Sequence, residues 1–185
     1  MPPGALTRNG AHSGMDDGRR PMHQAYLDSL ELGLFEAGEA FKGLADANVW
    51  RRPAPNLLSV GELAGHMAYW QAIRLAGEGE DPAKCRVSSP LVDTRFRCYD
   101  ATLAAAPGER HLAMGAEDVL AELTRVHRES VAHFRARNPD PESPVPGLPG
   151  WTYGEQLKYL VFHNAYHTGQ IYSVRHLLGE HPPDN

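Results

Sequence analysis

The chain has 185 residues, of which 42% are hydrophobic and 22% are charged, and these are values typical of a globular protein. Its formal net charge of −5 gives no electrostatic reason to expect nucleic acid or an anionic membrane as a partner. The two cysteines, Cys85 and Cys98, do not make the disulfide framework of a secreted protein, so we expect free thiols and a cytoplasmic location.

The first 21 residues are rich in Gly, Pro, Arg and Asp and contain no apolar run. They therefore resemble neither a signal peptide nor a membrane span, and we expect a flexible tail over residues 1–21. The remaining length suits one domain, which we place at residues 22–180. No other segment has the roughly 18 consecutive apolar residues that a transmembrane helix needs.

The first predicted helix covers about residues 22–45, where apolar residues recur at steps of three and four. An Arg-Pro-Ala-Pro sequence at 52–55 predicts an extended link after it. Ser59 followed by Glu62 has the pattern of a capping box, which marks the start of the second helix. Gly77 marks the end of that helix.

Residues 81–115 show no sustained periodicity and contain scattered prolines, which predicts a long crossing with a short helix around 94–105. Such a connection is long enough to cross a bundle, so the helices that it joins need not be antiparallel neighbours. The third helix is predicted over 116–137. It ends at the Asn-Pro-Asp-Pro sequence of 138–141, which cannot continue a helix.

The fourth helix starts at a second capping-box pattern, Thr152 with Glu155, and ends near Leu178 before Gly179. No segment shows the alternation that is typical of a strand. Four amphipathic helices predict an all-α protein, and specifically a four-helix bundle with a long crossover between helices two and three.

Three histidines on these helices form a candidate metal site. His163 and His167 are four residues apart, so they differ by about 40° around the helix axis and can chelate together. His66 lies in the apolar stripe of the second helix, where a metal bond is one way to satisfy a buried imidazole. Three protein ligands would leave one coordination position open. The alternative is that each histidine is an ordinary hydrogen-bonded core residue.

The other histidines do not compete for this role. His127 and His133 are six residues apart on the third helix, which disfavours joint chelation. The rest lie in the tail, in links or at helix ends, or point away from His163, and we expect them to be solvated: His12, His23, His111, His176 and His181.

Two segments resemble the DinB/YfiT-like superfamily: SVGELAGHMAYW at 59–70 and HNAYHTGQI at 163–171. The resemblance extends over roughly residues 22–178 and is looser over 81–115. It implies a four-helix bundle that forms a homodimer. It also implies that three histidines bind a divalent metal ion, zinc or nickel in many members: His66, His163 and His167.

A metal ion in such a site implies an enzyme that acts on a small molecule. The resemblance implies a thiol-dependent transferase or isomerase, because a low-molecular-weight thiol bound at the metal becomes a thiolate nucleophile. Bound water with a pKa near about 7 would instead support a hydrolase. The alternative is a non-catalytic, stress-induced bundle with a structural metal or an interaction role. A structural site would be closed by a fourth protein ligand, whereas a catalytic site would face a solvent-accessible cavity.

The sequence contains no clear general base beside the histidines. Four residues are candidates for contacts to the ligands or the substrate, although packing in the bundle or solvation at the surface is the favoured explanation of each: Glu36, Glu39, Tyr69 and Asn164. Aromatic residues close to the histidines in sequence either line a pocket or belong to the core: Tyr69, Trp70, Phe162 and Tyr166.

Overall fold

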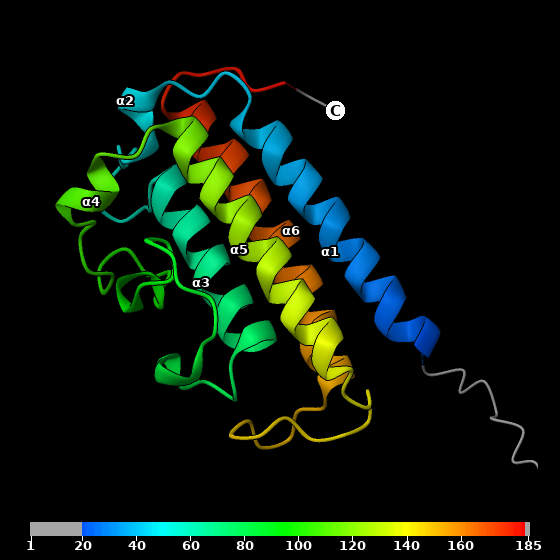
Figure 1. The fold of residues 1–185 in the computed structure, drawn as a ribbon. Helices are drawn as coiled ribbons and strands as arrows, with labels where there is room; N and C mark the ends of the chain where they lie inside the picture. The colour runs from blue at the N-terminus through cyan, green and yellow to red at the C-terminus, as the bar shows by residue number, and fades with distance from the viewer. Residues whose placement is uncertain (1–19, 184–185) are drawn as a thin grey trace, which may run out of the picture.

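The computed structural model describes residues 20–183, and the regular elements within this range are all helical. The long helices are α1 (Arg20–Phe41), α3 (Val60–Ala76), α5 (Ala116–Arg137) and α6 (Tyr153–Leu177) (Figure 1). The short elements are α2 (Asp46–Val49), η1 (Pro82–Lys84), η2 (Thr94–Phe96) and α4 (Glu109–Leu112). The predicted all-α class is confirmed. The predicted tail lies outside the described residues, except that Arg20 and Pro21 already belong to α1.

The long helices pack in two parallel pairs. α3 lies against α5 and α6, and α1 lies against α6 and α5. Figure 1 shows that α3 and α5 run in one direction and that α1 and α6 run in the opposite direction. The crossing segment, which we define as residues 77–115, makes the parallel pairing of α3 and α5 feasible because it returns the chain to the end where α3 began. It lies along the outer side of α3 (Figure 1).

Both predicted capping boxes are present. Ser59 Oγ accepts a hydrogen bond from the Glu62 backbone N–H at 3.3 Å, and the Glu62 carboxylate accepts one from the Ser59 N–H at 2.8 Å. Thr152 and Glu155 repeat this arrangement at the start of α6. The first helix is shorter than predicted, because the chain turns at Gly43, whose φ of 68° lies in the left-handed region. The helices that carry the three histidines therefore start where the sequence predicts.

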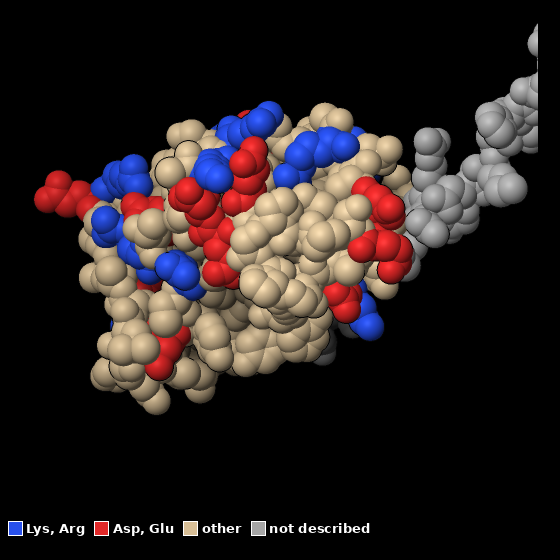
Figure 2. All heavy atoms as spheres, turned by 90° about the horizontal axis from the view of Figure 1, so that it is seen from below, with Lys and Arg blue, Asp and Glu red and all other residues tan. Residues whose placement is uncertain are grey.

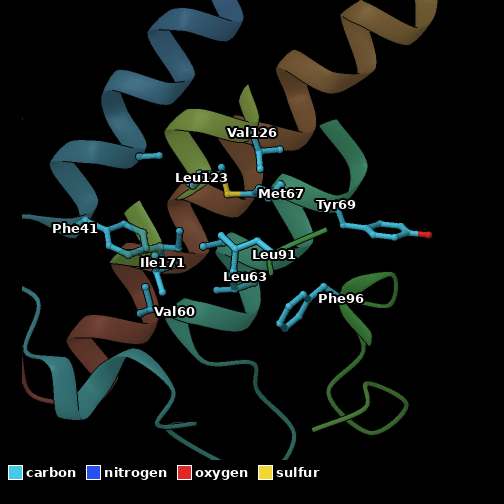
Figure 3. Close-up of a cluster of buried hydrophobic side chains, with 14 of the residues drawn as sticks. Phe41, Val60, Leu63, Met67, Tyr69, Leu91, Phe96, Leu123, Val126 and Ile171 are labelled. Carbon is cyan, nitrogen blue, oxygen red and sulfur yellow. The ribbon is translucent and has the colours of Figure 1, made fainter. Parts of the chain in front are cut away.

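The main core lies where α3 meets α5, α6 and the end of α1. Figure 3 shows several of its side chains: Phe41, Val60, Leu63, Met67, Leu123, Val126 and Ile171. α3 is buried along almost its whole length, because the crossing segment covers the side that the other helices leave open. Its histidine, His66, is therefore buried as well.

Two glycines of α3 allow aromatic rings to lie directly on its backbone. A Cβ atom at Gly61 would lie 2.6 Å from the Trp50 ring, and one at Gly65 would lie 2.7 Å from the Phe96 ring. The rings of Trp50 and Phe96 stack on each other with centroids 6.3 Å apart. Phe96 belongs to η2, so this close approach fixes the crossing segment on α3 (Figure 3).

The prediction of a short helix around 94–105 is wrong. This stretch contains only the 3-10 turn η2, and the α-helical turn α4 comes later. Aspartate side chains explain the interruption: Asp93 accepts from the backbone N–H of Arg95 at 3.0 Å, and Asp100 accepts from that of Thr102 at 2.9 Å. Such local bonds stabilise separate turns at the expense of a continuous helix.

Cys85 and Cys98 are free thiols, as predicted. Within residues 20–183, no helix combines the length and the apolar character that crossing a bilayer requires. Figure 2 shows the end of the molecule where α3 ends and α6 begins. Basic and acidic side chains intermingle there around a broad uncharged area.

Candidate metal centre

Three buried histidines from two helices meet at one point. His66 projects from α3, and His163 and His167 project from successive turns of α6. Their exposed fractions are 3%, 5% and 2%, so all three imidazoles are removed from water. Each offers a nitrogen, and these three nitrogens lie within 4.8 Å of one another. The structure thus brings together all three residues that the sequence singled out, in an arrangement that could hold a metal ion.

The imidazole ring on α3 lies in contact with both imidazole rings on α6. The Nε2 atoms of His66 and His163 are 3.1 Å apart. The ring centroid of His167 lies 4.7 Å from that of His66 and 4.4 Å from that of His163. Four-coordinate zinc binds imidazole nitrogens at about 2.0–2.1 Å, which separates neighbouring ligand atoms by roughly 3.3 Å. The observed spacing of the two Nε2 atoms fits such a site.

Hydrogen bonds at Nδ1 leave two of the three Nε2 atoms free to bind a metal. His66 Nδ1 lies 2.8 Å from the backbone oxygen of Phe96, which can only accept, so Nδ1 carries the proton. His167 Nδ1 lies 2.6 Å from Oε1 of Gln170, another acceptor. In a neutral imidazole the other nitrogen then has a lone pair. Acceptors of this kind orient metal-binding histidines and fix their tautomer in known sites.

Burial keeps these imidazoles neutral. Loss of hydration lowers the pKa of His66 to about 4 and that of His163 to about 3, and it also lowers the pKa of His167. Positive charge on neighbouring histidines further lowers the pKa of the first two. A metal ion binds only unprotonated imidazole. At neutral pH the site is therefore in the state that a divalent cation requires.

The three histidines line a cavity of about 700 Å³. Tyr99, Phe162 and Tyr166 lie in the same wall and are about half exposed or more, so the cavity opens to solvent. Among the described residues, no fourth His, Cys, Asp or Glu joins the histidine cluster. The arrangement therefore resembles an open site with space for a ligand and does not resemble a closed structural one.

The crossing segment supplies much of the cavity wall. Its residues there include Tyr99, whose ring centroid lies 5.8 Å from that of His66 and 6.0 Å from that of His167. Arg52 ties this segment to the start of α3, because it pairs with Glu62 and donates to the Ala101 carbonyl at 3.0 Å. The crossing segment, whose sequence shows no sustained periodicity, thus forms part of the entrance to the histidine site.

The other sequence candidates divide between the cavity and the core. Trp70, Phe162 and Tyr166 line the cavity, whereas Tyr69 is a core residue with 1% exposure. Asn164 is buried near Gly33 of α1 and is not a wall residue. The two glutamate candidates do not line the cavity either, and one of them pairs with Lys42: Glu36 and Glu39.

Sequence reasoning missed several residues around the site. Tyr159 lines the cavity and lies four residues before His163, so the same spacing rule that joined His163 and His167 would have found it. Gln170, three residues after His167, has the same kind of signal. Phe96 and Tyr99 have none, because their approach to His66 depends on tertiary packing of an irregular segment.

The prediction that the remaining histidines are solvated is wrong for two of them. His23 is buried in the first turns of α1, where its ring packs edge-on against Phe134. His111 is fully buried in α4, because its ring nitrogens bond to the Pro90 carbonyl and the Gly108 N–H. His176 and His181 are exposed, and His12 lies outside the described residues. His127 is buried and bonds to Gln71, apart from the cluster.

Comparison with known families gives one match. A family model described as the DinB superfamily matches residues 36–171, which is well over half of the chain and includes all three histidines. The comparison with curated proteins gave no match.

Proposed function

The chain belongs to the DinB superfamily, and from that premise we propose that it is a divalent-metal-dependent enzyme acting on a small molecule. The ion is held by His66, His163 and His167. The observation that supports this proposal most strongly is that the three neutral imidazoles converge at the wall of an open cavity. A site with no such opening would suit a structural ion.

Within this proposal, His66, His163 and His167 would hold the divalent ion, which would supply a lowered pKa to a thiol or a water molecule at its open position. The chain's own residues orient the reactants. Phe96 and Gln170 fix two of the imidazoles through their Nδ1 atoms. Trp70, Phe162 and Tyr166 give the cavity an apolar wall that limits water and packs against the hydrocarbon part of a substrate.

We favour a thiol-dependent transferase or isomerase over a hydrolase. Metal-assisted hydrolysis commonly uses a carboxylate as the general base, and none of the described residues that line the cavity is Asp or Glu. A thiol bound at the ion would have a lowered pKa and could release its proton to water in the open cavity, so it would need no such base. The co-substrate is then a low-molecular-weight thiol. Hydrolysis of a small ester or amide is the second candidate.

The non-catalytic alternative is a stress-induced bundle in which a metal ion is structural or the histidines serve another partner. The solvent-accessible cavity beside the cluster disfavours it. Zinc or nickel is the proposed ion, since both accept imidazole ligands. We also propose that the four long helices form the four-helix bundle of the family, with residues 77–115 as its crossover.

We propose that the protein is a homodimer. Two large apolar side chains three residues apart on α1 remain exposed and do not line the cavity: Leu32 and Phe35. A second copy that covers this face would bury apolar area that an isolated chain leaves in water. Sedimentation equilibrium tests this proposal, and a monomer at micromolar concentration would contradict it.

The metal content of untagged protein is the decisive experiment for the proposed function. We expect one bound ion per chain in the wild type, loss of the ion in His163→Ala, and retention in His176→Ala, which changes an exposed histidine of the same helix. Equal metal content in all three proteins would refute the site. If His163→Ala loses one metal ion per chain, the next step is to assay the wild type for thiol conjugation and for ester hydrolysis.

A further inference from the structure

The cavity beside the histidines has basic residues in one part of its wall. Among the described residues in its wall there are three arginines and no Asp or Glu, although the chain as a whole has a net charge of −5. The arginines come from the end of α3 and from the crossing segment: Arg74, Arg95 and Arg97. Such a wall attracts anions in addition to any attraction by a bound cation.

One of the three arginines has a structural role. Arg95 pairs with Asp93 at 3.1 Å and donates through Nη1 to the Ala106 carbonyl at 2.8 Å. Both contacts hold the crossing segment to itself. Asp93 also pairs with Arg110 at 2.5 Å and so offsets the charge of Arg95 only in part, but the guanidinium of Arg95 is already engaged within the segment.

The other two arginines share a single carboxylate. Arg74 pairs with Glu80 at 2.6 Å, and Arg97 lies 3.9 Å from the same residue. Two guanidinium groups and one carboxylate leave one positive charge in excess at the cavity wall. Arg97 is the less tightly paired of the two, and its side chain is 59% exposed.

Aromatic contacts hold this pair in place. The Arg74 guanidinium lies 5.1 Å from the centroid of the Trp70 ring and 6.0 Å from that of Trp151. Trp70 Nε1 donates to the Arg97 backbone carbonyl at 3.1 Å, which fixes the backbone of Arg97 at the wall. The Arg74 side chain is only 12% exposed, and its Nη1 has no hydrogen-bond partner among the described residues. Arg74 nevertheless lines the cavity, so part of its side chain is available to a ligand there.

We propose that the small molecule that enters the cavity carries a carboxylate group, which binds at Arg74 and Arg97 while another group of the same molecule reaches the histidines. This inference rests on the proposed function, which it extends to the chemical class of the ligand. Guanidinium groups bind carboxylates through paired, charge-assisted hydrogen bonds. The carboxylate offsets the excess positive charge and gives the molecule one orientation in the cavity.

The test compares two thiols of similar size, 3-mercaptopropionate and 3-mercapto-1-propanol, by calorimetric titration of the zinc-loaded protein at low salt. We expect the carboxylated thiol to bind about threefold to tenfold more tightly, the range for one partly exposed charge-assisted contact. Arg97→Gln should remove most of this preference, and Arg97→Lys should restore part of it. Arg86→Gln is the matched control, because Arg86 lies on the same segment, is exposed, and does not line the cavity.

Equal binding of both thiols by the wild type would overturn the inference. An equal loss of preference in Arg86→Gln and Arg97→Gln would also overturn it, since it would indicate only the overall charge of the protein. The same titrations on chelator-treated protein separate the inference from the proposed function. A carboxylate preference that persists there and depends on Arg97 supports the anion subsite even if no metal-dependent reaction is found. Absence of that preference in the chelated protein refutes the subsite.

Discussion

His66 and His163 lie 97 residues apart in sequence, and their Nε2 atoms lie 3.1 Å apart in space. The Phe96 carbonyl fixes the proton of His66 on Nδ1, so the His66 Nε2 atom is an acceptor. In the absence of a metal, His163 satisfies it by donating from its own Nε2. A bound cation would replace that proton and draw lone pairs from both rings. The same two Nε2 atoms thus share a proton in the metal-free protein and would share a cation in the metal-bound protein.

The first prediction concerns the acceptor behind His167. Gln170→Leu removes the oxygen that fixes Nδ1 of His167 and should weaken zinc binding about 10-fold to 100-fold, the usual effect of losing such a partner. Gln170→Glu retains an acceptor and should bind zinc at least as tightly as the wild type. Competition with a chromophoric chelator measures both. Identical zinc affinities for the Leu and Glu variants would show that Gln170 does not support the site.

The second prediction concerns the close contact between α3 and the crossing segment. Gly65→Ala places a methyl group 2.7 Å from the Phe96 ring and should lower the free energy of unfolding by about 1–3 kcal/mol, the range for overpacking. Displacement of Phe96 should also weaken zinc binding, because the Phe96 carbonyl holds His66. Urea unfolding and zinc titration measure the two effects.

Gly169→Ala is the control for that substitution. Gly169 lies in α6, near the histidine pair, and an added Cβ atom meets nothing within 4 Å. This change should raise the free energy of unfolding by up to about 1 kcal/mol through helix propensity. Destabilisation of the same size in both variants would contradict the packing argument.

The third prediction concerns pH. The folded-state pKa values of His66 and His163 are about 4 and about 3, below the value of about 6.5 for an unfolded chain. The unfolded state therefore binds more protons as the pH falls below about 6.5, and the metal-free protein loses stability over that range. Two such groups change the free energy of unfolding by about 1–3 kcal/mol per pH unit near pH 5.

Urea unfolding of chelator-treated protein at several pH values tests this expectation. His163→Asn removes one of the groups and should flatten the dependence of stability on pH between 6.5 and 4. His176→Asn, at an exposed position, should leave the dependence unchanged. A wild-type stability that is constant from pH 7 to pH 5 would show that the imidazoles are not held neutral.

The fourth prediction concerns stabilisation by metal. An ion that binds only the folded state adds about 2.7 kcal/mol at a concentration 100 times its dissociation constant. Zinc should therefore raise the melting temperature of the wild type and leave that of His167→Ala nearly unchanged. Differential scanning calorimetry with and without zinc measures this difference. A zinc-dependent rise of equal size in His167→Ala would place the bound ion elsewhere.

The sequence predicted those features that depend on neighbouring residues. The capping boxes at Ser59 and Thr152 locate the helices because their hydrogen bonds span only three residues. The pairing of His163 with His167 follows from helix geometry in the same way. The position of His66 in an apolar stripe indicated its burial, although not its partner.

Features that depend on distant contacts were not predictable from the sequence. His111 is buried because Trp50 and an earlier part of the crossing segment, including Pro90 and Phe96, pack against it, and nothing in its local sequence indicates this. The same reason applies to Tyr99 and Arg97, which reach the cavity from a stretch without periodicity. Residues 94–105 do not form the predicted helix, since the side chains of Asp93 and Asp100 stabilise separate turns.

The division of labour between the helices and residues 77–115 has a consequence for how such a protein diversifies. α3 and α6 hold the three histidines, while a separate stretch of chain supplies Tyr99 and Arg97 to the entrance. Exchange of that stretch would alter which molecules are admitted and leave the imidazole nitrogens where they are, provided that a residue at position 96 still presents its carbonyl to His66. Grafting the corresponding stretch from a relative is thus a route to altered selectivity on an unchanged helical framework.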